Sequence, residues 1–304
     1  MESNNPLLCD YETGTCEMPG LGTINEDTLI YDKKQKPVQI TYFTDPICSS
    51  CWGIEPQLRK LKLEYGAYIN IEYRMGGLLP SWDGFNGGGI TKPSDVAHHW
   101  DEASRYYQMP IDGNVWLEDP LDSSYPPSIA FIAAKMQNDA KADKFLRRIK
   151  EMVFTEKKNI AKWENLYQAA LQTGLDAERF KQDFEGEAKR LFQADLNFAR
   201  TMGVRGFPTL FFANDGGEQQ ILKGFKAYEH FEQMVKDLYP GAKKAMIDTD
   251  ASAVFEYYPT LTTKEFSVIT DDTLEASRKI LQGLANDGLL EKVATRNGDL
   301  WKKK

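Results

Sequence analysis

The sequence is poor in cysteine and histidine, and it has no long apolar run. Its 304 residues contain four cysteines and three histidines. So few cysteines exclude a disulfide-stapled scaffold, and closely spaced pairs in such a chain are typical of redox or metal sites. No stretch approaches the roughly 18 apolar residues that span a bilayer, so we expect no membrane partner. No basic segment followed by an apolar run opens the chain, so we expect no secretory signal and a cytoplasmic location.

An excess of basic residues is also missing. The chain has 37 Lys and Arg against 45 Asp and Glu, which gives a net charge of -8. An acidic chain repels phosphate backbones, so we expect no nucleic-acid partner. Hydrophobic residues make up 41% of the chain and charged residues 27%, as in ordinary globular proteins. The length suggests about two domains. We expect no bound cofactor.

A strand, a helix and a second strand follow one another in the first third of the chain. Segment 37–43 is β-rich, and a proline is tolerated at the first residue of a strand. From Ser50 apolar residues recur at helical spacing, and 67–75 is again β-rich. Two strands joined by a helix over so short a span indicate a parallel βαβ unit with a right-handed crossover.

A long helical tract separates this unit from two later strands. The tract covers about 95–203, and strands are predicted at 208–213 and 219–223. Helices inserted between strands of one sheet form a lid or a subdomain. The predicted division is an irregular N-terminal arm (1–36), an α/β domain (37–94 with 204–240), an inserted helical subdomain (95–203) and a C-terminal tail (245–304).

The C-terminal tail has the pattern of a small unit of its own. Thr262 and Glu265 fit a capping box, and 273–287 is predicted to be helical. Two short strands then follow around the turn residues Asn297 and Gly298. Helices followed by such a hairpin suggest a winged helix-turn-helix. Its basic residues are offset by acidic ones, so it lacks the basic face of a DNA reader, and we favour a docking module for protein partners.

Cys48 and Cys51 lie two residues apart, between the first strand and its helix. At the mouth of a helix, backbone N–H groups and the positive end of the helix dipole stabilise a thiolate. A second thiol one turn deeper can resolve a mixed disulfide. We therefore predict Cys48 as the nucleophile and Cys51 as the resolving thiol. The alternative is half of a zinc site, although such a site needs four ligands and the histidines are distant in sequence.

A second segment, Gly206-Phe-Pro-Thr209, opens the third strand. In a thioredoxin fold this loop faces the cysteines, and the backbone of Phe207 can pair with an extended substrate strand. Pro208 taken alone would be an ordinary start of a strand. We expect Phe207, Trp52 and Pro46 to line a substrate groove, although an aromatic residue such as Trp52 beside a helix start is often only packing.

Two carboxylates flank the thiols. Asp45 and Glu55 could pass a proton from Cys51. Glu55 could equally be a solvated side chain on the helix surface, and we favour that interpretation.

The order of these motifs resembles the DsbA family of thioredoxin-like proteins that carry a helical insertion. The resemblance covers about 37–240, through Phe43-Thr-Asp-Pro-Ile-Cys-Ser-Ser-Cys-Trp-Gly-Ile-Glu-Pro56 and Gly203-Val-Arg-Gly-Phe-Pro-Thr209. It is nearest to the FrnE-like branch of dithiol-disulfide isomerases. It implies an α/β thioredoxin fold, with Cys48, Cys51 and a cis Pro208 as the working residues. The small winged-helix-like unit that the tail pattern suggests lies beyond the stretch it covers.

The chain also resembles the Spx adaptor family, which delivers a transcription factor to the ClpXP protease. The similar stretches are Asp45 to Pro56, Leu58 to Gly66, Asp112 to Trp116 and the terminal Gly298 to Lys302. The resemblance implies an adaptor whose action does not require thiol turnover.

Cys9 and Cys16 bracket a turn-forming loop short enough for a disulfide. We hypothesise an auxiliary redox pair that exchanges with Cys48 and Cys51, and FrnE-like proteins can carry a second pair at a different spacing. The alternatives are two ordinary cysteines or a four-cysteine metal site, and we expect no metal.

Two functions therefore remain. The first is a thiol-disulfide oxidoreductase or isomerase that acts on proteins with cysteines or disulfides, through Cys48 and Cys51. The alternative is a non-enzymatic adaptor that presents a protease client.

Overall fold

The computed structural model describes residues 9–10, 15–17, 36–83 and 90–304 of the chain. Most of the predicted N-terminal arm therefore lies outside the described residues. We expected this arm to be irregular, but its described part contains two short strands. These are β1 (Cys9–Asp10) and β2 (Thr15–Glu17), which pair antiparallel with each other.

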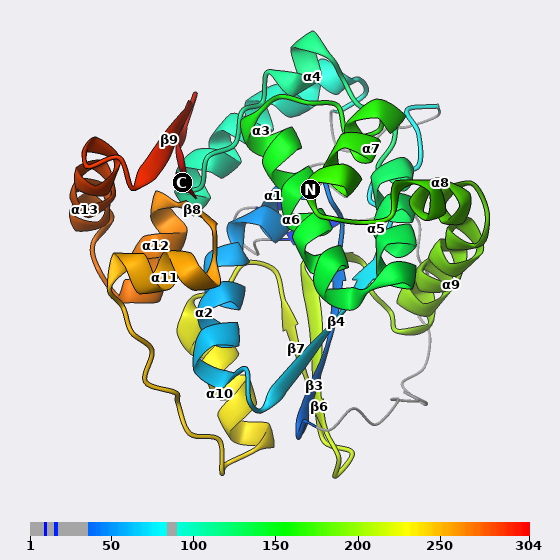
Figure 1. The fold of residues 1–304 in the computed structure, drawn as a ribbon. Coiled ribbons are helices and arrows are strands. Elements are labelled where there is room, and N and C mark those ends of the chain that lie inside the picture. Colours follow the sequence, from blue (N-terminus) through cyan, green and yellow to red (C-terminus); the bar gives the residue numbers. More distant parts are fainter. Residues whose placement is uncertain (1–8, 11–14, 18–35, 84–89) are drawn as a thin grey trace.

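A four-stranded sheet of order β4-β3-β6-β7 forms the centre of the molecule (Figure 1). β3 (Val38–Thr44) pairs parallel with β4 (Ile69–Met75), as the predicted βαβ unit requires. β6 (Thr209–Asn214) pairs antiparallel with β3, and β7 (Gln219–Lys223) pairs antiparallel with β6. All four strands lie within about two residues of the predicted positions.

The helix predicted from Ser50 is divided in two. α1 (Ser49–Gly53) ends at Ile54, and α2 (Glu55–Tyr65) begins there with a proline in its first turn. Proline is favoured at that position because it lacks the N–H that the first turn leaves unpaired. α2 packs against α10 (Tyr228–Leu238), and both lie on the same side of the sheet (Figure 1).

The inserted subdomain is helical, as predicted. α9, its last helix, packs against β4 at the edge of the sheet. Within the described ranges, no helix is long and apolar enough to cross a bilayer. The helices are α3 (Pro93–Tyr107), α4 (Val115–Glu118), α5 (Tyr125–Gln137), α6 (Asp139–Thr155), α7 (Trp163–Gln172), α8 (Ala177–Glu185) and α9 (Glu187–Thr201).

The C-terminal residues form a unit with its own apolar core, which includes Phe266, Leu281 and Trp301. The predicted capping box is present, since Thr262 accepts from the N–H of Glu265 and Glu265 accepts from the N–H of Thr262. Its three strands have the order β8-β10-β9. Strand β8 and helix α11 were not predicted from the sequence. The elements are α11 (Ala251–Tyr257), β8 (Thr260–Thr262), α12 (Thr263–Thr270), α13 (Leu274–Asn286), β9 (Leu290–Thr295) and β10 (Gly298–Lys303).

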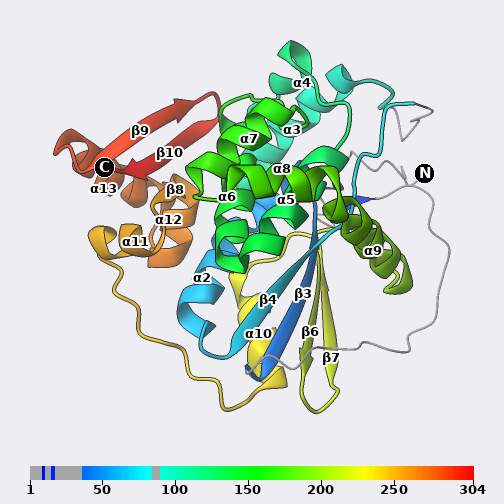
Figure 2. The ribbon, with the colours of Figure 1, turned by 45° about the vertical axis from the view of Figure 1, so that its right-hand side comes forward.

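A buried ionic cluster fixes this unit to the rest of the chain. Helix α12 packs against α2, and the Glu265 side chain at its start is 0% exposed. Arg147 of α6 donates to both Glu265 oxygens, over 2.6 and 3.0 Å, and Arg59 Nε lies 3.2 Å from Oε1. Arg147 also binds Glu151 at 2.7 Å. Figure 2 shows the resulting shape, with the β9–β10 hairpin projecting from the side of the body.

Candidate functional site

Cys48 is the N-cap residue of α1, directly after the turn that ends β3. Its sulfur accepts from the N–H of Cys51 over 3.3 Å, and its thiol donates to the carbonyl oxygen of Phe207 over 3.8 Å. Both thiols are free. The Phe207–Pro208 peptide bond is cis, the geometry that the family resemblance implies. The structure therefore brings Cys48, Cys51 and the Phe207-Pro208 loop together.

In this structure the Cys48 sulfur is buried, and its surroundings do not favour the thiolate that we expect at a helix mouth. Cys48 is 0% exposed, and Cys51 is also buried. Burial raises the pKa of Cys48 well above its usual value, and a hydrogen bond and negative charge on Cys51 raise it further. Burial also disfavours a Cys51 thiolate, but the bond from Cys48 and the charge of Lys150 outweigh it, so the pKa of Cys51 is lowered. Negative charge on the pair is favoured at Cys51.

A short strand from the N-terminal part of the chain lies beside the thiol site. β5 (Gly206–Phe207) carries β2 as an antiparallel neighbour, with Cys16 paired to Phe207 and Glu17 to Gly206. β2 also packs against α1. A strand from the start of the chain thus lies next to the helix that Cys48 caps, which could not be predicted from a spacing motif.

Glu55 is not the solvated side chain that we favoured. Its carboxylate accepts from Lys150 over 2.7 Å, and the two side chains are 12% and 0% exposed. Burial alone would raise the pKa of Glu55, but the charge of Lys150 and of two neighbouring arginines holds it at about 2. Such a carboxylate does not accept a proton near neutrality. Sequence reasoning missed Lys150, whose signal is its position midway between Leu146 and Phe154 on one apolar helix face.

Asp45 is better suited to hold a proton. It is fully buried, and its carboxylate accepts from the N–H groups of Ile47 and Leu78 and from the Ser124 hydroxyl, at 2.7–3.0 Å. Burial raises its pKa to about 6, although these hydrogen bonds counteract the rise. Asp45 therefore changes its charge in the physiological range while fixing the loop between β3 and α1.

The side chains expected to line a groove are instead packed in the interior. Trp52 is buried, stacks on Phe154 at 5.4 Å between ring centres, and lies under the Arg147 guanidinium at 4.4 Å. The Phe207 ring is buried against Gly76, and Pro46 is buried as well. The expectation for these three side chains is therefore wrong, since they build the support of the site. The backbone of Phe207 pairs with that of Cys16 in β2.

Comparison with known proteins places the chain in a family. The family model described as Thioredoxin matches residues 42–233. The ClpXP adapter protein SpxH of Halalkalibacterium halodurans is 33% identical over 304 residues, which cover 98% of this chain and 97% of that protein. The protein of the same name from Bacillus subtilis is 32% identical over 88% of this chain and 90% of its own length.

The chain belongs to the SpxH family of thioredoxin-fold proteins.

Solved structures place this family member among DsbA-like folds. A putative protein disulfide isomerase from Nitrosomonas europaea superposes with a TM-score of 0.56 at 23% identity, over 68% of this chain and 97% of that one. The cytosolic disulfide reductase DsbM from Pseudomonas aeruginosa gives 0.52 at 23% identity, over 66% and 97%. At this identity the likeness shows the fold alone. The match to the SpxH protein of Halalkalibacterium halodurans, by contrast, covers 98% of this chain and so includes the C-terminal unit.

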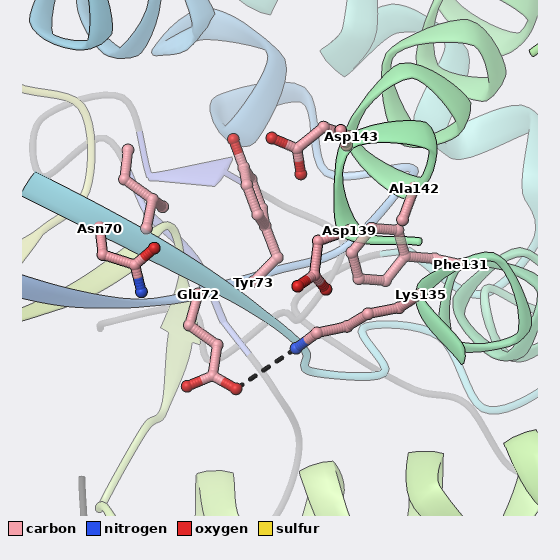
Figure 3. A pocket seen from close by; sticks show the side chains of 10 residues that line it. Asn70, Glu72, Tyr73, Phe131, Lys135, Asp139, Ala142 and Asp143 are labelled. Atoms are coloured by element: carbon pink, nitrogen blue, oxygen red, sulfur yellow. Dashed lines mark hydrogen bonds and ion pairs between the residues drawn. The ribbon is translucent and has the colours of Figure 1, made fainter. Parts of the chain in front are cut away.

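Two cavities of this SpxH-family chain lie away from the thiols. One, of about 150 Å³, lies between β4 and helices α5 and α6, where Lys135 reaches Glu72 at 3.3 Å (Figure 3). Another, of about 200 Å³, lies between α3 and the C-terminal unit and is lined in part by Arg105, Lys264 and Arg278. Among the described residues no cluster of three or more His, Cys, Asp or Glu gathers in a metal-binding arrangement.

Proposed function

We propose that the chain is an adaptor that presents an Spx-like client protein to the ClpXP protease, and that it does so in the cytoplasm. The observation that carries this proposal is the buried docking of the C-terminal unit on the thioredoxin-fold body through Glu265. An adaptor has to hold two partners at a fixed spacing, and two units joined by a desolvated ionic cluster provide a rigid frame. The full-length match to proteins named as ClpXP adapters supports it.

The thiol site supports the same proposal. Cys48 is buried and its pKa is raised, so it is poorly suited to attack a protein disulfide in this state. Binding a client requires surface and no turnover. The site then serves as a packed support for the fold.

We assign client or protease docking to the C-terminal unit, residues 245–304. Two helices followed by the β9–β10 hairpin support a winged-helix-like fold for it, separate from the body (37–94 with 204–240) and the helical insert (95–203). Its large apolar side chains Ile280 and Leu289 are 42% and 57% exposed. We take these two side chains as the candidate contacts for a protein partner.

A degradation assay with purified ClpXP and an Spx-family transcription factor tests the adaptor. The chain should accelerate loss of the client, and the I280D/L289D double variant should reduce that acceleration. Leu171→Asp provides the matched control, because Leu171 is 46% exposed on the helical insert. Absence of acceleration by the unmodified chain would overturn the proposal.

Thiol-disulfide exchange is a second candidate, favoured by the short path from Cys48 to the edge of β5. Cys48 would form the mixed disulfide, Cys51 would resolve it, and a client strand would pair with Phe207, as in the FrnE-like branch that the sequence resembles. Insulin reduction measures this activity. Equal rates for the unmodified chain and Cys48→Ser would remove the candidate.

A further inference from the structure

The N-terminal hairpin and the thiol site are joined by strand pairing. In the β1–β2 pair Cys9 lies opposite Cys16, and in the β2–β5 pair Cys16 lies opposite Phe207. The carbonyl of that same Phe207 accepts from the Cys48 thiol. Backbone register thus connects Cys9 and Cys16 to Phe207, the residue that Cys48 contacts.

β2 occupies the edge that an extended client would use. A peptide recognised by β-augmentation adds as a strand to an open sheet edge, and its register fixes which residue meets the reactive group. The residue opposite Phe207 in such a strand pairs with the residue whose carbonyl Cys48 contacts. In this chain that residue is a cysteine, and β2 also packs against α1, which Cys48 caps.

We propose that the N-terminal hairpin is an internal substrate of the thiol site, with Cys16 in the position of a client cysteine and Cys9 as its resolving partner. The inference rests on the second candidate function, thiol exchange at Cys48. It identifies the N-terminal hairpin as the partner in that exchange. The same hairpin would compete with client strands for the edge of β5.

The exchange balances without a further reagent once the Cys48–Cys51 pair has been oxidised by a client disulfide or a small-molecule disulfide. The Cys16 thiolate attacks the Cys48 sulfur, an S–S bond forms between them, and Cys51 leaves as a thiolate. The Cys9 thiolate then attacks the Cys16 sulfur and releases Cys48, which takes up a proton. The Cys48–Cys51 disulfide is reduced, and the hairpin dithiol is oxidised to a disulfide.

The charges around the site suit this direction. A leaving thiol departs faster when its pKa is low, and the pKa of Cys51 is lowered. Directly opposed residues of an antiparallel pair have Cα atoms about 4.5–5.5 Å apart, within the range that a disulfide spans. The pairing of Cys9 with Cys16 therefore satisfies the distance needed to close the second step.

Two matched full-length variants test the assignment of Cys16. C9S/C51S keeps only Cys16 and Cys48, and C16S/C51S keeps only Cys9 and Cys48. Each is treated with oxidised glutathione at low protein concentration, and the internal link is quantified by non-reducing peptide mapping with mass spectrometry. Because reaction between groups held together has a large effective concentration, we expect at least about tenfold more internal link through Cys16 than through Cys9.

Equal yields in the two variants, or a link through Cys9 alone, would overturn the inference. The glutathione adduct of Cys48 separates the remaining outcomes. An adduct on Cys48 with no link to Cys16 refutes the internal substrate and leaves thiol exchange standing. If neither a glutathione adduct of Cys48 nor an internal link forms, both thiol exchange and the inference are refuted. The adaptor proposal is not affected by that result.

Discussion

Replacing Glu265 by glutamine tests whether the C-terminal unit is held by charge. In the wild-type chain Arg59 and Arg147 face the two carboxylates Glu151 and Glu265, so this buried cluster is electrically neutral. Glutamine keeps the shape of the side chain and its capping bond to the N–H of Thr262, because Gln serves in a capping box as well as Glu. The substitution therefore removes the charge and leaves one buried arginine charge without a counter-charge.

The expected cost is about 3–5 kcal/mol, the usual loss when one partner of a buried ion pair is removed. The effect should be local, since the cluster joins α12 to α2 and α6. Hydrogen exchange of the α12 amides reports the free energy of local opening. At about 1.4 kcal/mol per tenfold change, α12 protection should fall at least about a hundredfold while β3 and β6 change little.

An exposed pair in the same unit provides the control. Glu275 and Lys279 are paired at 2.9 Å with side chains 77% and 76% exposed, so Glu275→Gln should leave the exchange of α12 nearly unchanged. A loss of protection smaller than about threefold in Glu265→Gln, or an equal loss in the control, would refute the reasoning that the buried charge holds the unit.

Three further substitutions have expected outcomes. The raised pKa of Asp45, about 6 against 3.8, gives a stability contribution present below pH 4 and lost as pH rises through 6. Urea titrations of the wild type should show this fall, of about 3 kcal/mol, and Asp45→Asn should abolish it. Lys150→Met should raise the pKa of Cys51, whereas Lys150→Arg should not. A pH titration of the thiolate absorbance measures this pKa. Gly76→Ala, whose new Cβ would lie 1.8 Å from the Phe207 ring, should cost about 1–3 kcal/mol in thermal unfolding, while helical Gly283→Ala, in open space, should stabilise.

The strands around the thiols could be predicted because their signals are local. Residues 37–43 and 67–75 carry β-rich patterns, and the structure places β3 and β4 there. The capping box at Thr262 could also be predicted, since its two hydrogen bonds join residues three positions apart. β8 was missed because a strand of three residues has no period of its own and exists by pairing with β10.

The state of Cys48 could not be predicted, because it depends on contacts between distant segments. The motif places the sulfur at a helix mouth, where a low pKa is expected. Burial reverses that expectation, and the sulfur lies against Phe207, which is 159 residues away in the sequence. Likewise Glu55 looks like a surface residue until Lys150 from the helical insert is placed beside it.

The most direct test compares client degradation by ClpXP in the presence of the unmodified chain and of Cys48→Ser/Cys51→Ser. Serine preserves the small side chains of the buried pair and removes both sulfurs. If the chain acts by binding, the two proteins should accelerate degradation of the Spx-family client equally, under reducing and non-reducing conditions. Loss of acceleration in a folded double-serine variant would contradict the account and return the function to the thiols.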